Sequence, residues 1–264
     1  TAFRFALHPV GPTVMAGPVV WAAEDTTEVL RFYRDFAAEA PDELGTVVRL
    51  GTVPPLPVIP EELHWRPAIA VACCYAGAVE DGERAVRALR RFGTPLVDLI
   101  GPAPYAAFQG ALDDTVLHGW HYYWKATNLA GLSDDVIAVI ADHAYAASSP
   151  LSYAAMFHMG GAVARAPQLA TAYAGRDVEH NIVVDAVWRP EEAAECAQQC
   201  ALNALAAVRS GRSRARRRSN SAHSRSSRAP RSRAVWWAAS RSILSRCSGW
   251  LRSISSAGAM PHCW

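Results

Sequence analysis

The two ends of this 264-residue chain differ in composition, and this difference limits which part can fold. All 24 Asp and Glu residues lie within residues 1–195 beside 13 basic residues, which gives this part a formal charge of −11. Residues 196–264 hold 13 Arg and 15 Ser but no acidic residue. The overall charge of +2 therefore sums an acidic body and a basic tail. We predict a folded domain over residues 1–195, which is long enough to bury a core, and a low-complexity tail over residues 196–264.

The tail has three possible interpretations. Residues 209–233 are rich in Arg and Ser, a composition that cannot bury a core and predicts disorder. They could form an arm that neutralises nucleic-acid phosphates, or a segment for a membrane surface or an acidic partner. The third interpretation is a shifted reading frame, since the acidic density of residues 1–195 would place about 8 acidic residues in the tail. We favour the shifted frame.

Neither a membrane span nor a disulfide framework is indicated. No run approaches the ~18 apolar residues of a transmembrane helix. Six Cys are few for this length, and Cys73 and Cys74 are adjacent in an apolar run, where small buried residues are common. The chain begins at Thr1, so a leader was removed or the sequence is an internal piece. We expect a cytoplasmic protein by default.

Hydrophobic periodicity predicts an α+β domain. The segments that read as strands are residues 14–23, 46–50, 68–76, 120–128, 153–158 and 180–188. The segments that read as helices are residues 25–40, 80–92 and 133–147, with a further helix starting at Pro190. Hairpin-like strand pairs alternate with crossover helices. This order favours a largely antiparallel sheet with helices on one face.

Common catalytic motifs are missing from the sequence. Neither GxGxxG nor GxxxxGK occurs, and there is no GxSxG turn. His118 and His121 are three residues apart, but without a positioned carboxylate this spacing is weak support for a metal. We therefore predict no metal site.

Two predicted strands carry polar side chains that could bind a ligand. In residues 119–129, alternation places Tyr123 and Lys125, the only lysine, on one face. Lys125 is either a solvated rim residue or a polar group lining a cavity under the sheet. In residues 180–188, Asn181 and Asp185 share the more polar face and point toward water or a ligand. The substrate-binding candidates are thus Tyr123, Lys125, Asn181 and Asp185.

Several segments resemble one enzyme family in their order and spacing. They are TAFRFALHPVGP (1–12), YWKATNL (123–129), GGAVAR (160–165), and Arg176 followed by a strand ending at Trp188. Together they resemble the substrate domain of FAD-linked oxidases of the berberine-bridge-enzyme type, relatives of vanillyl-alcohol oxidase and p-cresol methylhydroxylase. The resemblance covers about residues 1–195.

This resemblance implies a small-molecule substrate and an FAD held mainly by an N-terminal domain. A hydride would pass from a substrate C–H to flavin N5 while a base removes a proton. Polar side chains on the strand matching residues 180–188 face the flavin in relatives, which implicates Asn181 and Asp185.

The chain also departs from the family pattern. The flavin domain is absent from this sequence, and no Tyr is followed two residues later by Asn, although the family's closing segment carries such a motif and its Tyr can act as the base. We therefore expect no turnover by this chain alone. The alternative is a non-enzymatic α+β binding domain whose Arg-rich arm contacts nucleic acid. We expect neither nucleic-acid nor membrane binding, and the oligomeric state stays open.

The shifted-frame hypothesis predicts that another frame of the coding DNA after Glu195 encodes a Tyr-x-Asn motif. Translation of all frames from the sequenced gene is the measurement. If none contains the motif, the hypothesis is wrong.

Overall fold

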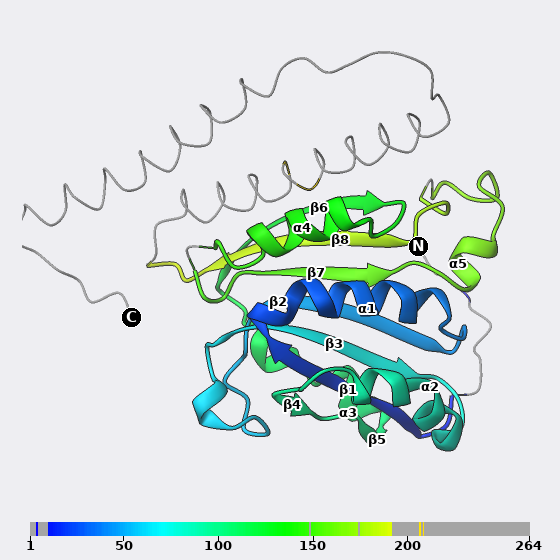
Figure 1. Cartoon of the computed structure of the whole chain (residues 1–264), viewed down its shortest axis with the longest axis horizontal. Helices are drawn as coiled ribbons and strands as arrows, with labels where there is room; N and C mark the ends of the chain where they lie inside the picture. The colour runs from blue at the N-terminus through cyan, green and yellow to red at the C-terminus, as the bar shows by residue number, and fades with distance from the viewer. Residues whose placement is uncertain are drawn as a thin grey trace, which may run out of the picture. The chain divides into compact units, whose positions relative to one another are not determined.

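A computed structural model describes residues 4, 10–147, 149–173, 175–191, 206 and 208. Its main feature is one antiparallel sheet of eight strands (Figure 1). The strands are β1 (Thr13–Ala22), β2 (Leu44–Thr52), β3 (Pro67–Tyr75), β4 (Val97–Asp98), β5 (Gly101–Pro104), β6 (His121–Leu129), β7 (Tyr153–His158) and β8 (His180–Trp188). The order across the sheet is β4-β1-β3-β2-β7-β8-β6, and β5 also pairs with β1.

Three helices form a layer on one face of the sheet (Figure 1). They are α1 (Thr26–Ala38), α2 (Val79–Arg91) and α4 (Asp134–His143). The shorter helices are α3 (Tyr105–Gln109) and α5 (Ala162–Arg165), with 3₁₀ turns at Ala23–Asp25, Glu61–Leu63 and Asp113–Thr115. In α1, Val29, Leu30, Tyr33 and Ala37 recur at helical spacing and are all buried. This stripe faces the sheet.

The main core lies between this helix layer and the strands. Alternation sends Val48 and Leu50 of β2, Ile69 and Val71 of β3 and Met156 of β7 into it. A second cluster lies on the other face of the sheet, where Val53, Ile59 and Leu63 from the loop 53–66 pack against Val20 and Ala68. That loop covers the β1–β3 end of the second face. Helices cover the first face, and we call the second one the open face.

The predicted fold class is confirmed. All six predicted strands occur, and β7 and β8 have the predicted bounds. Ser133 accepts a hydrogen bond from the amide of Val136 at 3.4 Å, but α4 ends at His143 rather than near residue 147. The predicted helix 25–40 is α1, which begins at Thr26, and Asp25 before it forms no side-chain capping hydrogen bond. The structure adds β4 and β5, which the sequence pattern did not predict.

The predicted tail falls almost entirely outside the described residues. The helix expected to start at Pro190 extends into undescribed residues, and the Arg/Ser-rich segment 209–233 lies wholly outside the described residues. Beyond residue 195, Ala206 and Val208 are helical, and Val208 is 3% exposed within the main core. The domain boundary at residue 195 stays a prediction.

A histidine inside the core gives the fold a pH dependence. His180 is 2% exposed, and neither ring nitrogen has a hydrogen-bond partner within the described part of the chain. Its ring lies 5.8 Å from that of Tyr33 and 5.5 Å from that of His158. Burial, aided by the neighbouring His158, lowers the pKa of His180 from 6.5 to about 4. The folded chain thus resists protonation that the unfolded chain accepts.

We predict that His180→Leu removes this acid sensitivity. The native chain loses stability as pH falls through 6.5, and the loss is complete below 4, because the unfolded state takes up the proton first. The stability of the variant relative to the native chain should rise by about 2 kcal/mol between pH 7.5 and pH 5. Urea unfolding followed by circular dichroism measures this. An equal difference at both pH values would contradict the assignment.

Candidate functional site

The open face carries two rows of side chains that cross strands β2, β7, β8 and β6. Antiparallel register places Tyr153 opposite Asp185, and Asp185 opposite Trp124. Four residues along, it places Phe157 opposite Asn181, and Asn181 opposite Asn128. Ala155, Val183 and Ala126 lie between the rows. Smaller side chains thus separate two rows of larger ones on β7, β8 and β6, and we call this part of the open face the cradle.

Asp185 is the central group of the first row. It is 2% exposed, although Trp124 beside it is 60% exposed. The Tyr153 hydroxyl and the Trp124 indole N–H are donor groups beside the carboxyl that favour its ionised form, while Oδ1 has no partner among the described residues. Tyr122 lies on the same face, near the carboxyl, and its hydroxyl donates to the Leu117 carbonyl at 2.9 Å. The carboxyl is therefore held by aromatic side chains with one oxygen left over.

The surroundings of Asp185 favour its neutral form. Burial raises the pKa of Asp185 from 3.8 to about 6, while the Tyr153 hydroxyl, the Arg49 charge and the Trp124 N–H act in the opposite direction. The same burial raises the pKa of Tyr153 well above 10. A carboxyl that titrates near neutral pH can both accept and release a proton at physiological pH. This site can therefore do acid–base chemistry.

The second row carries a polar pair at the other end of the cradle. Asn181 Nδ2 donates to Asn128 Oδ1 at 2.7 Å. In the segment between β7 and β8, Arg176 donates to the Val163 carbonyl at 3.1 Å and to Thr171 Oγ1 at 2.6 Å. The amide pair is thus fixed and lies on the same face as Asp185, four residues along β8.

The structure divides the four predicted site residues between two faces. Asn181 and Asp185 lie on the open face, whereas Tyr123 and Lys125 pair with Ala186 and Val184 on the helix side. Tyr123 packs on the cluster of Ala186 and Trp188. Lys125 is exposed, with its Nζ 5.2 Å from the Tyr123 ring centroid. The structure does not bring these two residues to Asp185, and their role in binding stays a prediction.

The sequence analysis did not select Arg49, Tyr153 or Trp124. A usable signal existed for Arg49, since it is the one charged residue inside the apolar strand LGTVVRLGT. Tyr153 and Trp124 carry no such signal, because their position beside Asp185 depends on strand pairing.

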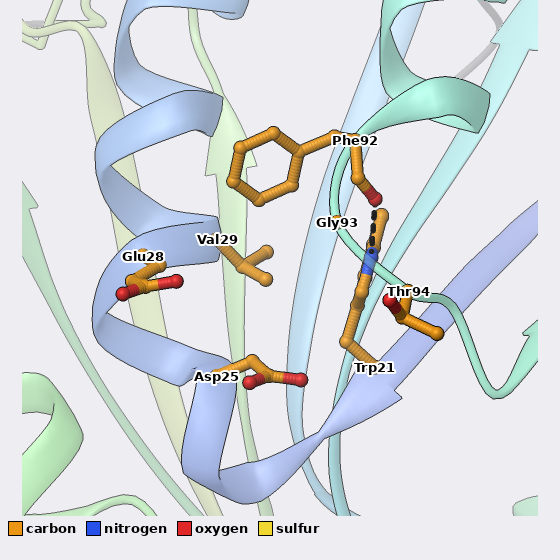
Figure 2. Close-up of a pocket in the computed structure, with 7 residues that line it drawn as sticks. All are labelled: Trp21, Asp25, Glu28, Val29, Phe92, Gly93 and Thr94. Atoms are coloured by element: carbon orange, nitrogen blue, oxygen red, sulfur yellow. Dashed lines mark hydrogen bonds between the residues drawn. The ribbon is translucent and has the colours of Figure 1, made fainter.

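A small pocket lies on the helix side, away from the cradle. It has a volume of about 190 Å³ and lies between the start of α1 and the turn after α2. Figure 2 shows the Asp25 and Glu28 carboxylates on one side and Phe92 with Thr94 on the other. The Trp21 Nε1 donates to the Phe92 carbonyl at 2.9 Å (Figure 2), so its polar atom is already used. This pocket is separate from the acid–base group.

Neither a metal-binding cluster nor a membrane-spanning helix is found among the described residues. Among the described residues, no group of three or more His, Cys, Asp and Glu side chains could hold a metal ion. Within the same residues, every helix is too short or too polar to cross a membrane.

Sequence comparison links the chain to a flavoprotein. It is 30% identical over 189 residues to an FAD-linked oxidoreductase of Dictyostelium discoideum, a match that covers 69% of this chain and 38% of that protein. The chain is related to the FAD-linked oxidoreductases. It spans well under half the length of this relative. No protein-family model matches the chain.

Solved structures of FAD-linked oxidases have the same fold. The wild-type berberine-bridge-like protein 1 of Physcomitrella patens aligns with a TM-score of 0.62 at 14% identity, covering 77% of this chain and 45% of that one. The 6-hydroxy-D-nicotine oxidase of Arthrobacter nicotinovorans aligns with a TM-score of 0.55 at 16% identity, covering 76% and 44%. The glucooligosaccharide oxidase of Acremonium strictum, which carries 6-S-cysteinyl, 8α-N1-histidyl FAD, scores 0.53 at 16% identity, covering 73% and 44%.

These matches confirm the resemblance to berberine-bridge-type oxidases and FAD as the cofactor of the family. Two features of this chain's open face are compatible with a planar cofactor group. Small residues lie between the two rows of the cradle, and the buried Oδ1 of Asp185 has no partner among the described residues. An orphaned buried oxygen is uncommon in a folded protein and marks a place where a further group can bind.

We predict that Asp185→Asn stabilises the chain at alkaline pH. Because the folded state raises the pKa of this carboxyl, the native chain loses stability as pH rises from 3.8 through 6. The stability of the variant relative to the native chain should be about 2 kcal/mol greater at pH 8 than at pH 4. Urea unfolding at both pH values tests this, and His180 cancels because both proteins contain it. A stability difference between variant and native chain that is the same at both pH values would show that ionisation of Asp185 does not destabilise the fold.

Proposed function

We propose that this chain forms the substrate-binding part of an FAD-linked oxidoreductase, and that its open face is the wall of the active site. The observation that carries the proposal is the buried carboxyl of Asp185 on the sheet face opposite helices α1, α2 and α4. When bound over this face, FAD supplies a hydride acceptor at N5.

Asp185 is the proposed proton acceptor. A substrate carbinol or amine must lose a proton as its C–H bond is oxidised, and a carboxylate with a pKa near 6 can take that proton at neutral pH. The Tyr153 hydroxyl and the Trp124 N–H hold the carboxylate in place. With a base on β8, proton removal does not require the tyrosine of a Tyr-x-Asn motif.

The remaining residues of the cradle orient the substrate. Trp124 and Phe157 are 60% and 39% exposed and offer aromatic surface to an apolar or sugar ring. The Asn128–Asn181 pair offers hydrogen-bonding groups at the other end. Sugars, alkaloids and polyketides are all compatible with such a surface.

The alternative, a nucleic-acid-binding protein with an Arg-rich arm, stays a prediction because residues 209–233 lie outside the described residues. The described residues add no observation in its favour. A cytoplasmic location likewise stays a proposal.

The test joins the flavin-binding part of the Dictyostelium relative to the N-terminus of the full chain. We expect a yellow protein whose flavin absorbance bleaches anaerobically with at least one compound from a panel of sugars, alkaloids and polyketide alcohols. Asp185→Asn should slow flavin reduction by about 100-fold or more, because a general base contributes that much. Asp142→Asn, the same substitution at an exposed position of α4 in the helix layer, is the matched control and should reduce at the native rate.

Two outcomes would contradict the proposal. One is a colourless fusion protein that nevertheless folds, as judged by circular dichroism. The other is a flavin-loaded fusion in which Asp185→Asn and Asp142→Asn both reduce at the same rate as the parent.

A further inference from the structure

Arg49 is a charged residue within the middle of the sheet. It lies on the open face of β2, opposite Ala155 of β7 and Ala70 of β3. None of the ion pairs formed within the described residues includes it. Its Nη1 donates to the Thr52 carbonyl at 2.7 Å, and Thr52 Oγ1 donates to the Pro150 carbonyl at 2.6 Å. These bonds fix the guanidinium without neutralising its charge.

The guanidinium lies against the ring of Tyr153. Its Cζ is 4.7 Å from the ring centroid, within the range of a cation–π contact. Gly51 makes room for this arrangement, because a Cβ at that position would approach the Cβ of Tyr153 to 2.9 Å. Arg49 and Gly51 of β2 thus determine where the Tyr153 ring lies.

Tyr153 in turn contacts the carboxyl of the site. It is directly opposite Asp185 in the β7–β8 pair, and its hydroxyl is a donor group that favours the ionised Asp185 carboxyl. Contacts therefore run without a break from Arg49 through Tyr153 to Asp185. We propose that Arg49 is a positioning residue, which fixes the Tyr153 ring for hydrogen bonding and favours the ionised form of Asp185 by its charge. The inference rests on the proposed function, in which Asp185 accepts a proton.

Electrostatics support this role. Burial raises the pKa of Asp185, and the Tyr153 hydrogen bond and the Arg49 charge are the two largest opposing influences. Because Arg49 orients the Tyr153 ring in this proposal, both of these influences on Asp185 depend on Arg49. Lysine would preserve the charge but not the planar face that stacks on the ring.

The experiment titrates Asp185 in the full 264-residue chain by ¹³C NMR of the aspartate γ-carbons, with the signal assigned by Asp185→Asn. Arg49→Met should raise the titration midpoint by about one pH unit, because a nearby opposite charge and an oriented hydrogen bond are both lost. Arg49→Lys should raise it less. Tyr153→Phe should raise it while leaving the arginine in place. Arg91→Met, which removes an exposed guanidinium on α2, is the matched control and should leave the midpoint unchanged.

The double variant separates positioning from charge alone. If Arg49 acts partly through Tyr153, the rise in Arg49→Met/Tyr153→Phe should be smaller than the sum of the two single rises. Additive rises, or an unchanged midpoint in Arg49→Met, would overturn the inference. If Arg49→Met fails to fold, the midpoints of Arg49→Lys and Tyr153→Phe decide the matter. The inference is overturned if Arg49→Lys raises the Asp185 midpoint as much as Tyr153→Phe or more. It is also overturned if Tyr153→Phe leaves the midpoint unchanged.

Failure of this inference is distinguishable from failure of the proposed function. A native Asp185 that titrates near 4 removes the basis of both. A native midpoint near 6 that Arg49→Met leaves unchanged overturns only the role of Arg49.

Discussion

The fold depends on a sheet that, within the described part of the chain, has the helix layer of α1, α2 and α4 on one face and no such layer on the other. Alternation along β2, β3, β7 and β8 sends large apolar side chains toward the helix layer and mostly small or polar ones to the open face. An antiparallel sheet tolerates this division because each face can have its own environment. The loop 53–66 covers one end of the open face, and the cradle around Asp185 lies on the strands beyond it. The site is therefore a consequence of the sheet's asymmetry.

The cradle also carries an energetic cost that the rest of the fold must offset. Asp185 is buried without an ion-pair partner, and Arg49 is a charge with no carboxylate at ion-pair distance within the described part of the chain. Buried ionisable groups of this kind destabilise a domain and are concentrated at functional sites. The donor groups of Tyr153 and Trp124 beside the carboxyl reduce the cost of ionising it. Stability and proposed chemistry thus oppose each other at the same residues.

Local pattern was enough to predict the strands that have strong alternation or apolar runs. The predicted bounds of residues 153–158 and 180–188 match the observed ones because both segments contain aromatic or β-branched residues and are flanked by turn residues. β4 has only two residues and β5 reads GPAP, so neither has a detectable period. The separation of Lys125 from Asp185 could not be predicted, since it depends on the β6–β8 register rather than on either strand alone. For the same reason Tyr153 and Trp124 were not predicted, whereas alternation along residues 180–188 and the family resemblance both made Asp185 a candidate.

The central claim is that the open face, rather than the helix layer, meets the flavin-binding part of the protein. Hydroxyl-radical footprinting of the full chain, alone and joined to the flavin-binding part of the Dictyostelium relative, tests it most directly. The account predicts that Trp124 and Phe157, the exposed aromatic side chains of the cradle, become protected, while Tyr123 on the helix side keeps its reactivity. Protection of Tyr123 with Trp124 and Phe157 unchanged would contradict the account.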